Sequence, residues 1–411
     1  MDDINYKTED YCSILKEYLT YHEQYTQKYE KCIILMLVGS FYEIYAILDT
    51  DKSDKKKTIG PDLYELSDLL NVYIGQKKTK KTTFSMIGFP DYTLHKYRNI
   101  LLNQNYTLVI VDQVTPAPNP ERAVVEILSP GTIIETYDKE DSHYLISIYI
   151  NRFPISGHKS IYSVGFSVID ISTGKNYVHK IISSLEDEEI WSDEIYRFIH
   201  YYSPKELLIH FDVNEIQLSK EEIIHRWLIK NVHLNIIDSK DFYKPSYQKD
   251  YLRKVFPHTG VLSPIEYLGF ERDPDITISY MYMIQFIYEH KMENVKEIFK
   301  PIHKQVENYL VLSHSCLYQL YIVDTHEHVD EKYSSLMSLL NQCSTSIGRR
   351  LLKERLLYPI LDPDQLNKRY DEIQYFQEIK EGNRMYAACI PSLRKILDIE
   401  KSQRDKLKFS K

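Results

Sequence analysis

The chain has 411 residues, more than one ordinary domain holds and enough for two to four. Hydrophobic residues make up 43% and charged residues 27%, a balance that is typical of globular domains with packed cores. No apolar run reaches the ~18 residues of a membrane span, and the acidic start Met1-Asp2-Asp3 lacks the layout of a signal peptide. We therefore expect a soluble intracellular protein with no membrane partner.

Cysteine and histidine spacing argues against a metal site. No two of the five cysteines form a CxxC pair, so neither a zinc site nor a disulfide framework is expected, and all five suit small core positions in a reducing compartment. His326 and His328 stand two positions apart, and such residues do not share a helix face. The cysteines are Cys12, Cys32, Cys316, Cys343 and Cys389.

The net charge of −8 means that any nucleic-acid binding has to come from a local basic patch. Residues 51–100 hold ten Lys and Arg against six Asp and Glu, a local charge of +4. The alternative is that these lysines are two solvated loop tips. The two clusters are Lys52, Lys55, Lys56 and Lys57, and then Lys77, Lys78, Lys80 and Lys81.

The first 120 residues or so predict a small mixed α/β domain. Helical and strand-like segments alternate, and Gly39-Ser40 interrupts an apolar stretch of strand length. The proline-rich stretch 115–120 excludes regular structure near the end of this unit. The expected helices are 10–31 and 92–102, and the expected strands are 33–38, 83–87, 106–111 and 124–128, with 41–48 continuing apolar after the break.

The next unit also alternates strands with helices, which predicts a layered α/β domain. The expected strands are 144–150, 162–171, 177–182 and 206–210, and the expected helices are 190–201 and 220–228.

From about Thr277 helical spacing takes over and glycine nearly disappears, which predicts an all-α region. No capping signal precedes Lys411, so we expect the helical domain to continue beyond it. The expected helices are 278–292, 306–320, 336–340, 347–356 and 363–378.

Several segments are similar, in order, to the motifs of one known family. Val38-Gly39-Ser40-Phe41-Tyr42-Glu43-Ile44-Tyr45 resembles the Gly-Asp-Phe-Tyr-Glu-Leu-Phe signature of the MutS family of mismatch repair proteins. Met86-Ile87-Gly88-Phe89-Pro90, with His95 after it, resembles Met-Ala-Gly-Ile-Pro-Tyr-His. The order of the similar segments agrees with the family along essentially the whole chain. The further segments are 66–74, 111–114, 121–133, 165–174, 203–208 and 346–352, with Pro359.

The resemblance implies a multidomain chain. It implies a mixed α/β mismatch-recognition domain over 1–122 and an α/β, RNase H-like connector domain over 123–260. A helical lever and core region over 261–411 follows, incomplete at its C-terminus.

The resemblance also implies that Phe41 is an aromatic wedge and that Glu43 contacts a displaced base. A mismatch lowers the cost of bending, and an apolar ring pushed between base steps kinks the duplex. Side chains two positions apart share one face of a strand, so Glu43 accompanies Phe41. From the local sequence alone the alternative is a buried Phe41 beside a surface Glu43. Ser40 replaces the family's usual Asp, without touching the wedge chemistry.

Supporting DNA contacts are expected around the wedge. Gly39 and Ser40 let the strand bend and approach the minor groove, with Tyr42 beside them. Phosphate contacts are expected from Lys77, Lys78, Lys80 and Lys81, and less strongly from the lysines at 52–57.

No Gly-x-x-x-x-Gly-Lys-Ser/Thr run occurs in the sequence, so no ATP site, catalytic residue or cofactor is expected in this chain. The resemblance places an ATPase that uses ATP and Mg²⁺ in a further C-terminal region. It implies double-stranded DNA with mismatches or small loops as the ligand, a homodimer, and a MutL-type partner at the connector. Two alternatives stay open: an interaction scaffold that binds DNA without mismatch preference, and an enzyme with a site of its own.

Overall fold

The computed structural model forms two compact units, each described here by itself. The first comprises Met1–Ile133 with Glu289–Met292, and the second Ile134–Tyr288 with Glu293–Lys411. The structure describes residues 13–29, 31–48, 58–78, 83–115, 121–132, 144–155, 160–171, 173–184, 186, 189–211, 219–227, 232–236, 240–290, 298–304, 309–310, 312–322, 333–382 and 392.

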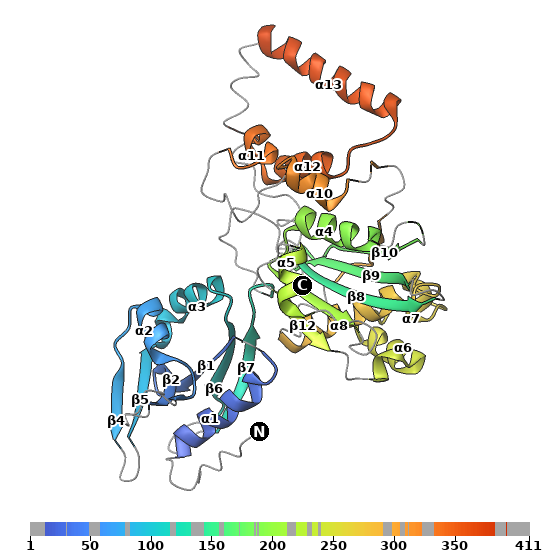
Figure 1. Cartoon of the computed structure of the whole chain (residues 1–411). Helices are drawn as coiled ribbons and strands as arrows, with labels where there is room; N and C mark the ends of the chain where they lie inside the picture. The colour runs from blue at the N-terminus through green and yellow to red at the C-terminus, as the bar shows by residue number, and fades with distance from the viewer. Residues whose placement is uncertain are drawn as a thin grey trace. The chain divides into compact units, whose positions relative to one another are not determined.

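A mixed sheet forms the centre of the first unit (Figure 1). Its strand order is β4-β5-β2-β1-β6-β7, with β3 paired to β2. The β1–β6 pair is parallel, and the other pairs are antiparallel. The strands are β1 (Cys32–Val38), β2 (Phe41–Leu48), β3 (Thr58–Ile59), β4 (Gly75–Lys78), β5 (Thr83–Pro90), β6 (Thr107–Gln113) and β7 (Arg122–Leu128).

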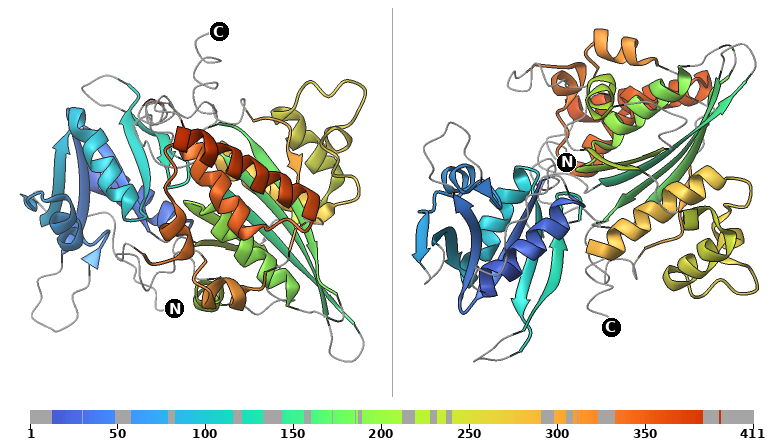
Figure 2. Two further views of the ribbon diagram at one scale, coloured as in Figure 1. Left: turned by 90° about the horizontal axis from the view of Figure 1, so that it is seen from above. Right: turned by 60° about the horizontal axis from the view of Figure 1, so that its bottom comes forward.

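Helices cover both faces of this sheet, which is seen from two further sides in Figure 2. The ring of Tyr18 on α1 packs edge-on against Tyr45 of β2, with 5.2 Å between the ring centroids. On the opposite face Tyr97 of α3 packs against Phe89 of β5 at 4.3 Å. Since side-chain direction alternates along a strand, the two faces of β2 meet different helices. The helices are α1 (Ser13–Thr26), α2 (Leu63–Leu70) and α3 (Leu94–Asn103), the last preceded by a short 3₁₀ turn, Asp91–Thr93.

The sheet of the second unit has the strand order β12-β11-β8-β9-β10-β13. Its central β8–β9 and β9–β10 pairs are antiparallel, and the outer pairs are parallel. The strands are β8 (Tyr144–Pro154), β9 (Ser160–Asp170), β10 (Asn176–Ile182), β11 (Glu206–Phe211), β12 (Val232–Ile236) and β13 (Ile302–His303).

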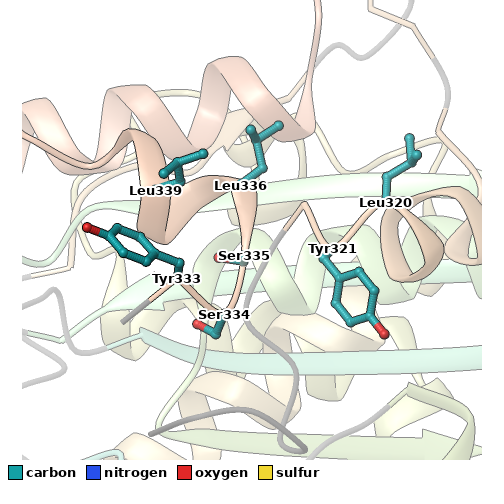
Figure 3. A pocket seen from close by; sticks show the side chains of 7 residues that line it. All are labelled: Leu320, Tyr321, Tyr333, Ser334, Ser335, Leu336 and Leu339. Carbon is teal, nitrogen blue, oxygen red and sulfur yellow. The ribbon is translucent and has the colours of Figure 1, made fainter. Parts of the chain in front are cut away.

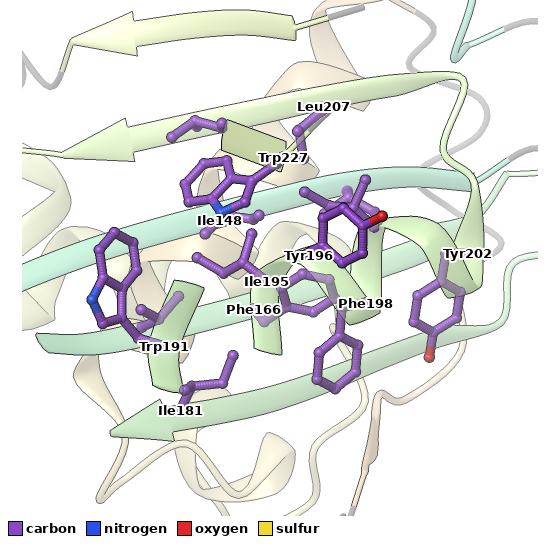
Figure 4. Close-up of a cluster of buried hydrophobic side chains, with 14 of the residues drawn as sticks. Ile148, Phe166, Ile181, Trp191, Ile195, Tyr196, Phe198, Tyr202, Leu207 and Trp227 are labelled. Carbon is purple, nitrogen blue, oxygen red and sulfur yellow. The ribbon is translucent and has the colours of Figure 1, made fainter. Parts of the chain in front are cut away.

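Helices α4 (Ile190–Tyr202) and α5 (Lys220–Trp227) cover one face of this sheet. Trp191 and Phe198 of α4 and Trp227 of α5 pack onto alternate strand residues such as Ile148 and Phe166 (Figure 4). Burial of these apolar surfaces stabilises the unit, because removing them from water is favourable.

Helix α8 (Pro274–His290) covers the opposite face of the same sheet. The hydroxyl of Ser279 donates to the Ser147 carbonyl at 2.7 Å, and the hydroxyl of Tyr280 donates to Asn176 Oδ1 at 3.2 Å. These bonds satisfy polar groups that are buried between helix and sheet. The shorter helices α6 (Pro245–Val255) and α7 (Pro264–Leu268) precede α8 in the chain.

Helices dominate the C-terminal part, so the expected fold class is confirmed, with one helix shorter than expected. Within 306–320 the described helix covers His314–Gln319, because Ser313 caps it and Tyr309 forms a β-bridge with Ile360. The short strand β13 also lies in this region, paired with β10. The helices are α10 (His314–Gln319), α11 (Leu336–Leu340), α12 (Ser346–Leu357) and α13 (Pro363–Gly382). The two boundaries between the three domains expected from the sequence stay predictions.

None of the helices that the structure describes is both long and apolar enough to span a lipid bilayer.

Candidate nucleic-acid interface

A two-residue turn joins β1 to β2 and places Phe41 at the start of β2. Val38 pairs with Phe41 across the hairpin, and Gly39 has a φ of +65°. A positive φ at the first turn residue suits glycine in the tight hairpin turns that match strand twist. The amide of Asp91 donates to the Ser40 carbonyl at 3.0 Å, which ties the turn to the residue after β5.

Phe41 is the exposed aromatic of this hairpin. Its side chain is 45% exposed although it lies in a strand whose next five residues are buried. Its partner on the adjacent strand β5 is Pro90, which has no N–H to donate. The alternative that Phe41 is buried is therefore wrong.

Glu43 lies two positions further along the same strand and is only 8% exposed. Lys77 Nζ donates to both carboxylate oxygens, at 3.0 Å to Oε1 and 2.8 Å to Oε2. The Tyr45 hydroxyl donates to Oε2 as well. The carboxylate is thus held between an ammonium and a phenol, and the alternative of a surface Glu43 is wrong too.

The backbone opposite Glu43 is glycine, which makes room for its side chain. Gly88 pairs with Glu43, and a Cβ on Gly88 would lie 3.4 Å from Glu43 Cγ and 3.3 Å from Met86 Cε. Both distances are at or near the limit of ordinary van der Waals contact. A side chain at Gly88 would therefore contact Glu43 and crowd the end of the Met86 side chain.

Tyr42 points to the other face of the sheet and is buried. Its hydroxyl donates to Asp112 Oδ1 at 2.8 Å, and its ring packs against Phe89. Burial, followed by the hydrogen bond to Asp112, raises the pKa of Tyr42. The expected contact of Tyr42 with DNA stays a prediction; its buried side chain supports the strand of Phe41 from the opposite face.

The expected basic residues are only partly within the described part of the chain. Lys77 and Lys78 lie on the short strand β4, at the edge of the sheet. Lys80 and Lys81, like the lysines at 52–57, lie outside the described residues. The structure pairs Lys77 with Glu43, a contact that the sequence did not suggest.

Sequence reasoning missed Tyr45, Gly88 and Tyr92. Tyr45 was signalled by its spacing, because it follows Glu43 by two and so shares its face. Tyr92 is 84% exposed in the 3₁₀ turn that begins at Asp91, whose amide binds the Phe41 hairpin. The contact between the Asp91 amide and the hairpin depends on the pairing of β5 with β2, which no local sequence pattern reveals.

No metal-binding cluster is found among the described residues. They contain no group of three or more His, Cys, Asp or Glu that could hold a metal ion. One hollow of the second unit is lined by side chains that carry no carboxylate, imidazole, thiol or ammonium (Figure 3). Its lining residues are Leu320, Tyr321, Tyr333, Ser334, Ser335, Leu336 and Leu339.

Two family models match the chain. The model of MutS domain I matches residues 16–137, and the model of MutS domain III matches residues 315–405. The first match contains the Phe41 hairpin, Glu43 and the strand that carries Lys77.

Curated relatives match most of the chain. It is 29% identical over 426 residues to a putative DNA mismatch repair protein, mutS homolog L359, of Acanthamoeba polyphaga mimivirus, with 95% of this chain and 37% of the relative covered. It is 30% identical over 359 residues to the DNA mismatch repair protein MutS of Borrelia garinii subsp. bavariensis, with 85% of this chain and 36% of the relative covered. The MutS protein of Petrotoga mobilis is 26% identical over 400 residues, with 94% and 42% covered. The chain therefore spans well under half the length of these relatives.

The domain I and domain III matches and the relatives agree with the motifs read from the sequence. The chain belongs to the MutS family.

Proposed function

We propose that this chain binds double-stranded DNA at mismatches and small loops, and that Phe41 is the wedge that probes the base step. The observation that carries the proposal is an exposed aromatic ring on a strand whose next five residues are buried. Exposing such a ring costs free energy in water, so a binding role accounts for it better than packing does. The curated relatives are named DNA mismatch repair proteins.

The physical basis is the weakness of a mismatched step. A ring entering between base pairs must unstack them, and a mismatch lowers that cost because its pairing and stacking are already poor. The hairpin suits insertion between base pairs because two hydrogen bonds, one behind the strand and one at the turn, hold it in place. Tyr42 binds Asp112 behind the strand, and the Asp91 amide binds the Ser40 carbonyl at the turn. A rigid strand keeps Phe41 in position when its ring contacts the base step.

Glu43 would then contact the displaced base edge as a hydrogen-bond acceptor. Its position two residues after Phe41 gives it the same side of β2. Lysines of the basic region, Lys78, Lys80 and Lys81 among them, would neutralise flanking phosphates. That contribution is independent of sequence and falls as salt rises.

Other properties that the family resemblance implies are proposed for the whole protein rather than for this chain. They include a homodimer, a MutL-type partner at the connector, and an ATPase that uses ATP and Mg²⁺. No chain residue is assigned to any of them. A scaffold that binds DNA without mismatch preference is the competing function.

The test is binding of the 411-residue chain to a duplex with one G·T mismatch and to its matched control. Fluorescence anisotropy gives both dissociation constants, and their ratio measures discrimination. Phe41→Ala should reduce the ratio roughly fivefold or more, because aromatic stacking on a base contributes about 1–3 kcal/mol.

The matched control is Tyr64→Ala, which removes another exposed aromatic ring of the same unit, on α2. It should leave the ratio unchanged. A Phe41→Ala chain that still discriminates would contradict the wedge assignment. A wild-type chain that binds both duplexes equally would favour the scaffold.

A further inference from the structure

The contacts around Glu43 conflict with its task at the base edge. Lys77 Nζ reaches both carboxylate oxygens, and the Tyr45 hydroxyl also donates to one of them. A carboxylate held in this way has little capacity left to accept a bond from a base. The three bonds occupy three of its about four acceptor positions, and release of Lys77 would free two of them.

Lys77 is the partner placed to change. It lies on β4, an edge strand of four residues, and its side chain is 42% exposed whereas that of Glu43 is 10% exposed. Tyr45 is fully buried and packs edge-on against Tyr18. The lysine is therefore the member of this group that an approaching phosphate can reach first.

An ammonium can exchange a carboxylate for a phosphate at modest cost, because one charge-assisted contact replaces another. Lys77 Nζ also lies 5.5 Å from the centroid of the Tyr45 ring, a cation–π contact at the outer limit of the usual distance, so leaving the ring gives up little. The exchange needs rotation of one long side chain and no change of the sheet.

We propose that Lys77 is a specificity-determining latch on Glu43. In the DNA-free chain its ammonium holds the carboxylate. When Phe41 enters a mismatched step, the ammonium transfers to a backbone phosphate and frees Glu43 for the displaced base. On a matched duplex Phe41 stays out, and Lys77 stays on Glu43. The latch rests on the proposed function.

The exchange has a signature in salt dependence. Each phosphate that a protein neutralises steepens the plot of log K against log salt by about 0.9 for duplex DNA. Lys77 neutralises a phosphate only on the mismatched duplex. The slope should therefore be steeper by about 0.9 on the mismatched duplex than on the matched one.

The experiment measures both slopes for the 411-residue chain and for three variants, each checked for unaltered thermal unfolding. In Lys77→Met the two slopes should become equal, since the exchanging charge is gone. In Glu43→Gln they should become equal at the steeper value, because an unlatched Lys77 contacts phosphate on either duplex. Lys78→Met removes the same charge at the next position of β4 and should keep the difference between the duplexes.

The outcomes separate the latch from the function on which it rests. Unequal affinities with equal slopes in the wild type would overturn the latch and leave mismatch binding intact. A slope difference that survives in Lys77→Met would also overturn it. Equal affinities at every salt concentration would contradict mismatch binding itself, and the latch with it.

Discussion

Phe41 and Glu43 leave the same face of β2 and end in opposite environments. Phe41 is 45% exposed, whereas Glu43 is 8% exposed and held by Lys77 and Tyr45. An apolar ring in water and a carboxylate in the protein interior both run against ordinary burial preference. Exceptions to the usual burial preference concentrate at functional sites, where some folding stability is lost so that a side chain can bind a ligand.

The hairpin turn makes the first prediction. Gly39→Ala should destabilise the chain by about 1 kcal/mol, because alanine at a φ of +65° meets its own carbonyl. A Cβ on Gly39 would meet nothing within 4 Å, so the cost is in the backbone alone. Thermal unfolding measures it.

Gly260 is a matched control for Gly39. It has the same φ of +65° and also nothing within 4 Å of a Cβ, but it lies in the second unit. Gly260→Ala should cost similar stability and leave DNA discrimination unchanged, whereas Gly39→Ala should lower discrimination by shifting Phe41. Equal effects of both variants on discrimination would show that the turn does not position the wedge.

The support behind the wedge strand makes the second prediction. Tyr42→Phe removes the hydrogen bond to Asp112 and should cost about 1 kcal/mol of unfolding free energy. Because burial and Asp112 raise the pKa of Tyr42 above its ordinary value of 10, its contribution is complete below pH 10 and is lost as the pH rises beyond that. Chemical denaturation at pH 8 and pH 10.5 measures the change.

Tyr106→Phe removes the matching bond to Glu65 Oε1 at 2.7 Å in the same unit and should behave alike in stability. Neither variant should change the ratio of mismatched to matched binding by more than about twofold, since Tyr42 lies on the face opposite Phe41 and Tyr106 is bonded to Glu65 of α2. A selective loss of discrimination in Tyr42→Phe would assign that hydroxyl a direct role.

The strands around the wedge were predictable from sequence, whereas the contacts between them were not. The run 33–38, the break at Gly39-Ser40 and the apolar stretch that follows match β1, the turn and β2. Apolar runs and glycine breaks are local signals. The family motif added a role for Phe41 and Glu43 that no local signal carries.

Lys77 shows why the rest escaped prediction. It is 34 positions from Glu43, and the two meet because β4 pairs with β5 while β5 pairs with β2. Strand order and register are tertiary properties that the sequence does not show directly. From the sequence alone, the lysine cluster therefore predicted only phosphate contacts and no contact with Glu43. The buried position of Tyr42, by contrast, follows from the same alternation along β2 that places Phe41 and Glu43 on one face.

Cysteine reactivity makes the third prediction. Burial raises the pKa of the Cys32 thiol to about 12, so its thiolate is scarce near neutrality. Cys316 and Cys343 are partly exposed. Iodoacetamide at pH 8 should alkylate these two within the time that leaves Cys32 unmodified, as read by peptide mass spectrometry. Labelling of native Cys32 at the rate of Cys316 would contradict its burial.

Lys304 makes the last prediction, which concerns pH. Its ammonium lies 4.1 Å from the ring centroid of Tyr201 and 4.2 Å from that of Tyr358. Burial lowers the pKa of Lys304 to about 8 from its ordinary 10.5; Glu354 and Glu194 oppose this shift, and Arg197 adds to it. Between these values the unfolded chain binds more protons than the folded one. The free energy of unfolding should therefore rise with pH from about 8 to 10, by up to about 2 kcal/mol.

Lys304→Met should abolish this rise, and Lys205→Met, at an exposed lysine of the same unit, should keep it. The window ends near pH 10 because Tyr201 and Tyr358 have raised pKa values, so ionisation of tyrosine in the unfolded chain then lowers stability. Denaturant unfolding at pH 8, 9 and 10 gives the slope for each chain. A wild-type slope of zero, or one that Lys304→Met retains, would mean that Lys304 is not responsible and that its ammonium is better solvated than its ring contacts indicate.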